Sequence, residues 1–227
     1  MKERDPGIKW FNTVFYPYRK TCRAVRYEDG VLPRLRQTEV VLFTPWGPRY
    51  HWEVRGESIL PSDKEVKVLH FLADVLQEWR TNMPGKEFRW LFLGADLYGS
   101  RINPLPIEVV RHYFDSLAKW LPQILPGAEF RLWSEFDEKA EIYRRKIWDN
   151  FDEYIPSVVL WQAEKAARVM GGNARLYLTE RLAEAMFIEE MFRPIKISCV
   201  ARNKDDTVDW ELPRLYFLPE KLHTPWL

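Results

Sequence analysis

The stretch Lys86–Arg111, KEFRWLFLGADLYGSRINPLPIEVVR, has the pattern of a β-strand, a polar loop and the start of a helix. Phe88–Leu93 is a run of large apolar residues between MPG and GADLYGS, which is typical of a buried strand. Pro106 stands where a first helical position would be, and Glu108 follows in the first turn; both favour a helix start. The stretch therefore predicts one strand–loop–helix unit of an α/β fold.

The loop of this unit is the first candidate site. It carries five polar residues within eight positions, namely Asp96, Tyr98, Ser100, Arg101 and Asn103. Ligands of open α/β sheets bind beyond the carboxyl ends of the strands. We therefore expect a ligand site at this loop.

The neighbouring segments repeat the alternation of strands and helices. Val40–Phe43 reads as a buried strand, and Ser62 with Glu65 forms a capping box at the start of a helix. Apolar residues at helical spacing follow there, and again from Val109 to Trp120, where we expect the helix to stop before Pro122. A further strand is expected at about 129–133. This order predicts parallel βαβ units.

The last third of the chain changes character. Residues 138–192 read as two or three helices, and strands are expected again at Pro194–Val200 and Pro213–Glu220. The predicted fold class is therefore α/β: a Rossmann-like three-layer fold with a mostly parallel central sheet and a helical insertion before the last strands. We predict an N-terminal arm at 1–38, packed on the core, and a single α/β domain at 39–227.

The composition of the chain limits the classes of function that it can have. The net charge of +1 leaves no global electrostatic signature for nucleic acid, and Cys22 and Cys199 suggest neither a disulfide framework nor a zinc site. No apolar run reaches the length of a membrane span, and no signal-peptide pattern follows the first residues. We expect a soluble protein of the cytoplasm.

The sequence predicts no metal and no cofactor. The four histidines lack HxH or HxxxH spacing, and Asp205, Asp206 and Asp209 lack the glycine and glutamate of a calcium loop. No Walker A loop, GxGxxG or nucleophile elbow is present. A small-molecule substrate bound by side chains alone is the expected partner.

Charged residues near strand ends supply the candidate chemistry. Four cations, namely Arg49, Arg101, Lys196 and Arg202, could hold a phosphate or a carboxylate, and ordinary surface cations or ion pairs are the alternative. Asp96 follows an apolar strand, where it would serve as a base, bind an ammonium group, or cap local structure.

Several motifs in fixed order resemble the isocyanide (isonitrile) synthase family over about Val40 to Leu227. They are LFTPWGPR at Leu42–Arg49, Gly56, Pro61–Glu65, Gly94–Asp96, the late strand Ile195–Val200, and Thr224–Leu227. The chain departs from the family pattern at Arg49, where a lysine is expected, at Ala95, where a serine is expected, and at Val200, where a histidine is expected. The terminal histidine of the family pattern has no counterpart.

The resemblance implies an activity and a set of site residues. The amino group of an aromatic amino acid would be converted to an isonitrile, with the carbon supplied by a phosphosugar, ribulose 5-phosphate. Asp96 would be the catalytic residue. The residues implied in substrate binding are Trp46, Arg49, Tyr98, Ser100, Arg101, Lys196 and Ser198.

Two other hypotheses remain open at this point. In the first, the same fold is a non-catalytic module that binds nucleic acid or a protein through basic and aromatic residues of the arm, namely Lys9, Trp10, Tyr18, Arg19, Lys20, Arg23 and Arg26. In the second, suggested by the aromatic content, the chain is an assembly subunit without chemistry. The sequence leaves the oligomeric state open.

Overall fold

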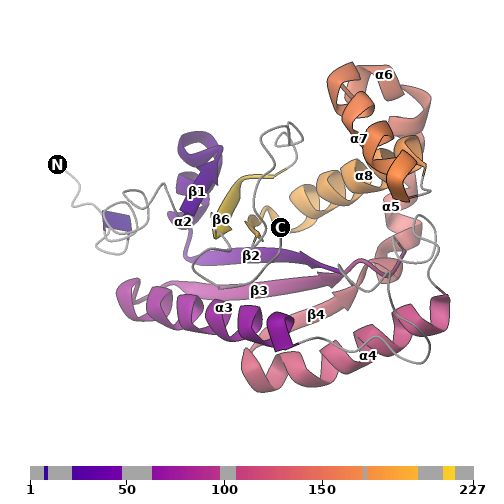
Figure 1. Ribbon diagram of the computed structural model, residues 1–227. Helices are drawn as coiled ribbons and strands as arrows, with labels where there is room; N and C mark the ends of the chain where they lie inside the picture. Colours follow the sequence, from indigo (N-terminus) through magenta and orange to yellow (C-terminus); the bar gives the residue numbers. More distant parts are fainter. Residues whose placement is uncertain are drawn as a thin grey trace.

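The computed structural model of the chain describes residues 8–9, 22–47, 63–97, 106–170, 173–198 and 212–217. They form one six-stranded sheet with helices on both faces (Figure 1). The strands are β1 (Cys22–Val25), β2 (Glu39–Trp46), β3 (Glu87–Gly94), β4 (Ala128–Leu132), β5 (Ile195–Ser198) and β6 (Arg214–Phe217). Five strands are parallel, and β1 pairs with β6 antiparallel at one edge. The predicted α/β, Rossmann-like fold class is confirmed.

The helices connect these strands in the expected order. They are α2 (Leu32–Leu35), α3 (Asp63–Asn82), α4 (Ile107–Ile124), α5 (Asp137–Asp149), α6 (Phe151–Tyr154), α7 (Ser157–Met170) and α8 (Ala174–Phe192). A π-helical turn, η2 (Tyr27–Val31), precedes α2, and a 3-10 turn, η5 (Trp133–Phe136), precedes α5. In Figure 1, α5, α6, α7 and the start of α8 form a helical lobe beside the carboxyl ends of the strands.

The strand order β1-β6-β5-β2-β3-β4 creates a topological switch point. From β2 the chain moves through β3 to β4 on one side, and it then returns through the lobe to β5 on the other side of β2. In open α/β sheets the crevice at such a reversal is where ligands bind. We therefore expect a ligand crevice at the carboxyl ends of β2 and β5.

Two apolar clusters hold the layers together. The cluster on one face of the sheet joins β2 and β3 to α3 and α4, with Leu42, Phe92 and Phe114 among its buried members. The cluster on the other face joins the strands to α5 and α8 through Phe43 and Phe187. Alternate residues of β2 therefore face opposite helix layers, as strand geometry requires.

Gly94 shows how tightly α4 packs on the end of β3. A Cβ added to this glycine would lie 2.8 Å from Cε1 of Phe114 and 2.9 Å from Cδ2 of Leu132. Only the absence of a side chain permits this approach. The last residue of β3 is thus fixed between α4 and β4, directly before the candidate loop.

The structure corrects one predicted boundary. α4 does not stop before Pro122 but runs through it to Ile124. Proline removes one backbone donor from a helix, but Leu121 and Leu125 on either side of it are buried in the core. The burial of these side chains outweighs the lost hydrogen bond.

The segment before residue 38 contributes to the sheet and the core. β1 supplies an edge strand, and Val31 and Leu35 are fully buried against the α3–α4 face. The division into an arm and a domain stays a prediction. Among the described helices, none has the length and apolar character that crossing a membrane requires.

Candidate functional site

The predicted site residues that the structure describes do not share one face of the sheet. Lys196 pairs with Phe43 across β5 and β2, and Phe43 belongs to the cluster under α8. Residues paired in register point to the same side of a sheet. Lys196, and with it Ser198 two positions later, therefore faces α8. Trp46, three residues after Phe43, faces α3 and α4.

Trp46 is anchored in a buried hydrogen-bonded chain. Its indole Nε1–H donates to the Tyr113 hydroxyl at 2.7 Å, and that hydroxyl in turn donates to the Glu65 carboxylate. Tyr113 is fully buried, and Trp46 and Glu65 are nearly so. The Trp46 ring also contacts Phe92 at a centroid distance of 5.9 Å. Trp46 is thus held in a fixed orientation at the end of β2, and its indole N–H is already hydrogen-bonded inside the core.

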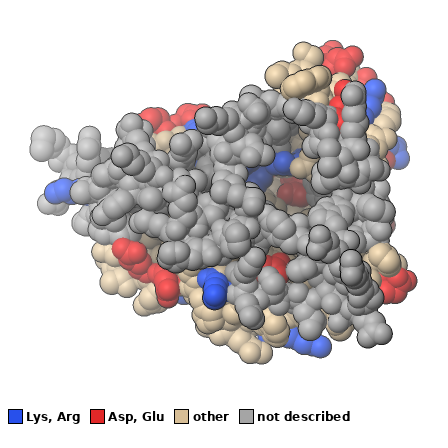
Figure 2. Space-filling model, viewed as in Figure 1, with Lys and Arg blue, Asp and Glu red and all other residues tan. Residues whose placement is uncertain are grey.

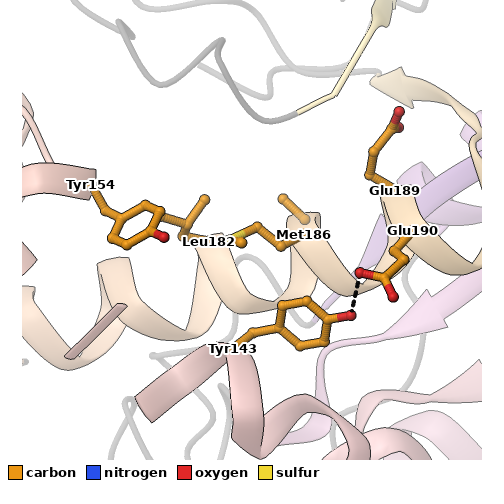
Figure 3. A pocket seen from close by; sticks show the side chains of 7 residues that line it. Tyr143, Tyr154, Leu182, Met186, Glu189 and Glu190 are labelled. Atoms are coloured by element: carbon orange, nitrogen blue, oxygen red, sulfur yellow. Dashed lines mark hydrogen bonds between the residues drawn. The ribbon is translucent and has the colours of Figure 1, made fainter. Parts of the chain in front are cut away.

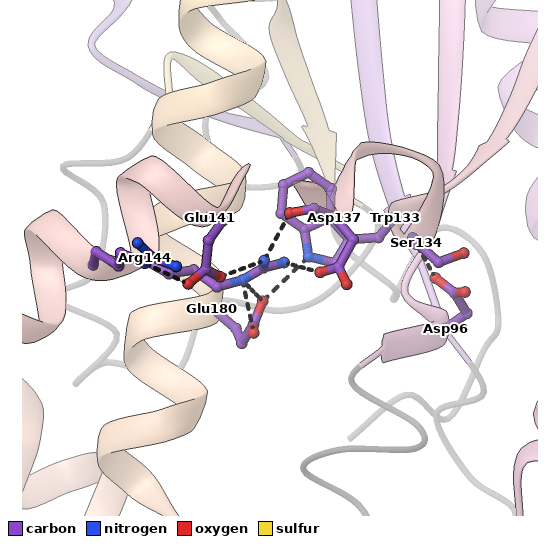
Figure 4. A network of polar contacts seen from close by, with 8 residues as sticks. Asp96, Trp133, Ser134, Asp137, Glu141, Arg144 and Glu180 are labelled. Atoms are coloured by element: carbon purple, nitrogen blue, oxygen red, sulfur yellow. Dashed lines mark hydrogen bonds and ion pairs between the residues drawn. The ribbon is translucent and has the colours of Figure 1, made fainter. Parts of the chain in front are cut away.

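Asp96 joins the ends of two strands. It lies two residues beyond β3, it is 7% exposed, and its Oδ1 accepts a hydrogen bond of 3.0 Å from the backbone N–H of Ser134. Ser134 belongs to η5, directly after β4. Asp96 therefore caps this turn, and the carboxylate is held beside the carboxyl ends of β3 and β4 (Figure 4).

A buried ionic network follows at the end of β4 (Figure 4). Nε of Arg144 contacts Glu180 Oε1 at 2.9 Å, and its NH2 contacts Asp137 Oδ1 at 2.7 Å. The Trp133 indole N–H donates to Glu180 Oε2 at 3.3 Å, and the Arg144 guanidinium lies over the Trp133 ring. Glu141 adds a third carboxylate to Arg144 at 3.4 Å. This network ties α5 and α8 to η5.

Buried charge concentrates on the α8 side of the sheet. Apart from Glu65 and Asp96, every described charged residue that is buried lies on α5, α8, β5 or β6, namely Arg144, Glu180, Glu184, Lys196 and Arg214. Lys196 and Arg214 are register partners on β5 and β6, so both face α8. On α8, residues Glu180 and Glu184 are one turn apart, on the same side as Phe187, which packs toward the sheet.

We call Glu180, Glu184, Lys196 and Arg214 the buried polar layer. Charged groups are costly to bury, so their concentration between one helix and two strands marks a candidate functional site. Figure 2 shows a hollow in the face seen in Figure 1, with acidic and basic side chains visible inside it. Such a mixture of charges suits a ligand that carries both signs.

Four predicted site residues, Arg49, Tyr98, Ser100 and Arg101, and the candidate cation Arg202 lie outside the described residues, as do Trp10, Tyr18, Arg19 and Lys20 of the arm. The roles of Asp96, Lys196 and Ser198 in a ligand site stay predictions. The sequence interpretation missed Glu180, Glu184 and Arg214. One signal was available, because two glutamates spaced by four residues interrupt the apolar stripe of α8.

Metal binding has no support among the residues that the structure describes. They contain no group of three or more histidine, cysteine, aspartate or glutamate side chains placed to hold an ion.

The capping role of Asp96 can be separated from a catalytic one. We expect Asp96→Ala to lower the free energy of unfolding by about 1–2 kcal/mol, because the Ser134 N–H loses its acceptor. Asp96→Asn keeps an acceptor oxygen and should cost much less. Urea unfolding of both variants checks this, and equal losses for the two substitutions would contradict the capping role.

The pH dependence of the free energy of unfolding should reveal the contribution of the Glu141 ion pairs. Hydrogen bonding from Arg145, and then from Arg144, lowers the pKa of Glu141 below its ordinary 4.5. Because the pKa is lower in the folded state, the stabilisation is present above the unfolded pKa and is lost as the pH falls through the folded value. We expect Glu141→Gln to cost about 0.5 kcal/mol at pH 7, since the Arg145 pair is exposed.

Urea unfolding of the wild type and Glu141→Gln between pH 7 and pH 3 measures this difference. It should shrink below pH 4.5. Glu138→Gln, an exposed position of the same helix, is the control for the loss of one charge. A difference that stays constant down to pH 3 would contradict the prediction.

Comparison with known proteins supports the fold. No family model and no curated protein matches the sequence. The tyrosyl-tRNA synthetase of Archaeoglobus fulgidus complexed with L-tyrosine is similar in structure, with a TM-score of 0.58 at 14% identity over 86% of this chain and 60% of that one. The tryptophanyl-tRNA synthetase of Plasmodium falciparum has a TM-score of 0.58 at 10% identity over 96% of this chain and 62% of that one.

A third similar structure is the tryptophanyl-tRNA synthetase of Encephalitozoon cuniculi bound to tryptophan. Its TM-score is 0.53 at 11% identity, over 89% of this chain and 59% of that one. The chain thus spans about three fifths of the length of these synthetases. At such low identity the similarity shows a shared Rossmann-like fold. It leaves the resemblance to isocyanide synthases as a prediction.

Proposed function

We propose that this chain binds an amino acid between α8 and the strands β5 and β6, beside the switch point of the sheet. The observation that carries the proposal is the buried polar layer: two buried cations of β5 and β6 face α8, and two buried carboxylates of α8 lie on the same side of that helix as Phe187. Lys196 and Arg214 would hold the ligand carboxylate, and Glu184 its ammonium group, because Glu180 is already bonded to Arg144 and Trp133.

Aromatic amino acids are the first ligands to test. Two of the structurally similar synthetases hold tyrosine or tryptophan. A zwitterion also fits the charge pattern better than a simple anion or cation, because both signs are present and buried. Trp46, held rigidly by Tyr113, would bound the crevice from the opposite side of β2.

The finer proposal concerns the reaction. The ordered motifs that resemble isocyanide synthases support conversion of the amino group to an isonitrile, with ribulose 5-phosphate as the carbon source. Asp96, just beyond β3 and only 7% exposed, is the base that we propose for proton removal. Its hydrogen bond to Ser134 holds the carboxylate in place for that role.

Isothermal titration calorimetry tests the binding step. We expect L-tyrosine or L-tryptophan to bind, and tyramine and 3-(4-hydroxyphenyl)propionate, which lack the carboxylate and the ammonium group respectively, to bind about tenfold more weakly or worse. Lys196→Met should weaken amino-acid binding, whereas Lys119→Met, at an exposed position of α4, should not. Absence of heat with every aromatic amino acid would contradict the proposal.

The reaction needs its own experiment. The protein is incubated with aromatic amino acids and ribulose 5-phosphate, and mass spectrometry follows the isonitrile and the sugar. Asp96→Asn is the informative variant, since it retains an acceptor for Ser134. Amino-acid binding without isonitrile and without consumption of sugar would leave the binding proposal standing and overturn the reaction.

A further inference from the structure

The side of α8 that carries Glu184 extends from the core to the surface. Tyr177, Arg181, Glu184 and Ile188 follow one another at helical spacing, which places their side chains along one side of the helix. Ile188 is fully buried in the apolar cluster on the sheet. Tyr177 and Arg181, at the other end, are half-buried. This side of α8 therefore continues the buried polar layer outward.

The chain connection shows where this side of α8 leads. β5 begins after a link of only two residues from the end of α8, so the strand runs back beneath the helix. The start of α8 lies in the lobe beside the carboxyl ends of the strands (Figure 1). At a rise of about 1.5 Å per residue, Tyr177 lies about 10 Å from Glu184 along the helix axis. An extended aromatic amino acid is of similar length.

Tyr177 and Arg181 contact each other at the outer end of this side. Nη1–H of Arg181 donates to the Tyr177 hydroxyl at 3.0 Å, and the guanidinium carbon lies 5.6 Å from the centre of the Tyr177 ring. The Tyr177 ring also packs against the apolar cluster of the lobe, which includes Leu178 and Val159. The lobe therefore holds the ring, and the ring orients a half-buried guanidinium.

The chemistry of this pair favours a phenol over other aromatic groups. A guanidinium carries five N–H donors and no acceptor, and its plane stacks on aromatic rings. A hydroxyl whose oxygen accepts from a cation is polarised to donate rather than to accept. A phenol combines a ring with an acceptor oxygen. The indole of tryptophan offers only a donor, and the ring of phenylalanine has no polar atom.

A pocket on the opposite side of α8 is separate from this surface. It opens between α8 and the helices α5 and α6, and Met186 lies in it between Tyr154 and Glu190 (Figure 3). At about 100° per residue, Met186 lies about 180° around the helix from Tyr177. Met186 therefore supplies a control position on the same helix.

We propose that the amino-acid site selects L-tyrosine through Arg181 and Tyr177. This selection rests on the proposed function above and names the side chain that the site accepts. With its ammonium group at Glu184, the ligand extends along α8 toward the start of the helix. Its phenol oxygen then accepts from the Arg181 guanidinium. Arg181 and Tyr177 determine specificity, and they do not hold the carboxylate or the ammonium group.

Three amino acids test the selection by isothermal titration calorimetry on the full chain. L-Phenylalanine lacks only the hydroxyl, and L-tryptophan replaces the acceptor by a donor. We expect both to bind about tenfold or more weakly than L-tyrosine. Equal affinities for L-tyrosine and L-phenylalanine would overturn the selection and leave the amino-acid site standing. Absence of binding by all three would overturn both proposals.

Variants of the pair separate selection from binding. Arg181→Met removes the donors, so it should weaken L-tyrosine about tenfold or more and leave L-phenylalanine nearly unchanged. Lys196→Met should weaken both ligands alike. Tyr177→Phe keeps the ring and should reduce the preference for L-tyrosine, because Arg181 loses its orienting hydroxyl. Arg145→Met, at a position of α5 whose side chain is 76% exposed, is the matched control. An equal loss of both ligands in folded Arg181→Met would overturn its role in selection.

Met186→Trp tests which side of α8 the amino acid occupies. The substitution fills the pocket of Figure 3, and thermal unfolding first establishes that the variant is folded. We expect its affinity for L-tyrosine to equal that of the wild type. If Met186→Trp loses L-tyrosine while Arg181→Met retains it, the amino acid binds in that pocket and the selection by Arg181 and Tyr177 is overturned.

Discussion

Glu180→Ala is expected to lower the free energy of unfolding by about 3–5 kcal/mol. Glu180 is 2% exposed and accepts hydrogen bonds from both Arg144 and Trp133. Its removal takes the most buried counter-ion from the Arg144 guanidinium, and Arg144 is only 9% exposed. The Trp133 indole N–H also loses its acceptor. Asp137 and Glu141 compensate only in part, because both lie nearer to solvent.

Urea unfolding at pH 7 measures this loss. The paired substitution Arg144→Met with Glu180→Leu is the informative control, because replacing both ions by apolar groups removes the uncompensated charge. We expect the double variant to be more stable than Glu180→Ala. If Glu180→Ala costs less than about 1 kcal/mol, the network is not the connection between α5, α8 and η5 that its geometry indicates.

Tyr113→Phe is expected to cost about 2–3 kcal/mol, although it removes a single oxygen atom. The hydroxyl accepts from the Trp46 indole and donates to Glu65, in a region where all three side chains are buried. The substitution leaves the indole N–H without its acceptor and takes one donor from a buried carboxylate. The aromatic packing of the ring against Phe114 is preserved.

Two measurements check this second prediction. Urea unfolding gives the loss of stability, with Tyr143→Phe as the matched control, because the hydrogen bond from Tyr143 to Glu190 is exposed. Tryptophan fluorescence of Tyr113→Phe should also change, since the environment of the Trp46 indole changes. A cost equal to that of Tyr143→Phe would show that the buried chain contributes nothing beyond an exposed hydrogen bond.

The sequence alone predicted only part of the candidate site. Asp96 was predicted because an apolar strand and a glycine precede it, and such local patterns are visible in sequence. Its partner, the backbone of Ser134, lies 38 positions away. Glu65 was expected at a helix start, but its bond to Tyr113 depends on how α3 and α4 pack together.

Local sequence patterns could not predict the buried polar layer either, because its burial also depends on contacts between residues distant in the chain. Glu180 and Glu184 read as the solvated face of a charged helix, and Arg214 reads as a polar residue at a strand start. Charge is normally exposed, and only the packing of α8 on β5 and β6 reveals that these groups are covered. Lys196 and Trp46 were both expected to bind substrate, and the register of β5 on β2 places them on opposite faces of the sheet.

By itself, the sequence determined the α/β class and the order of strands and helices from Val40 onward, because apolar periodicity and turn residues act over a few positions; β1, η2 and α2 were not predicted. The continuation of α4 through Pro122 already required tertiary contacts, since burial of the flanking leucines offsets the missing hydrogen bond. The strand order, the switch point between β2 and β5, and the two sides of α8 depend on contacts between residues distant in the chain. Tertiary structure alone therefore decided which charged side chains are buried together.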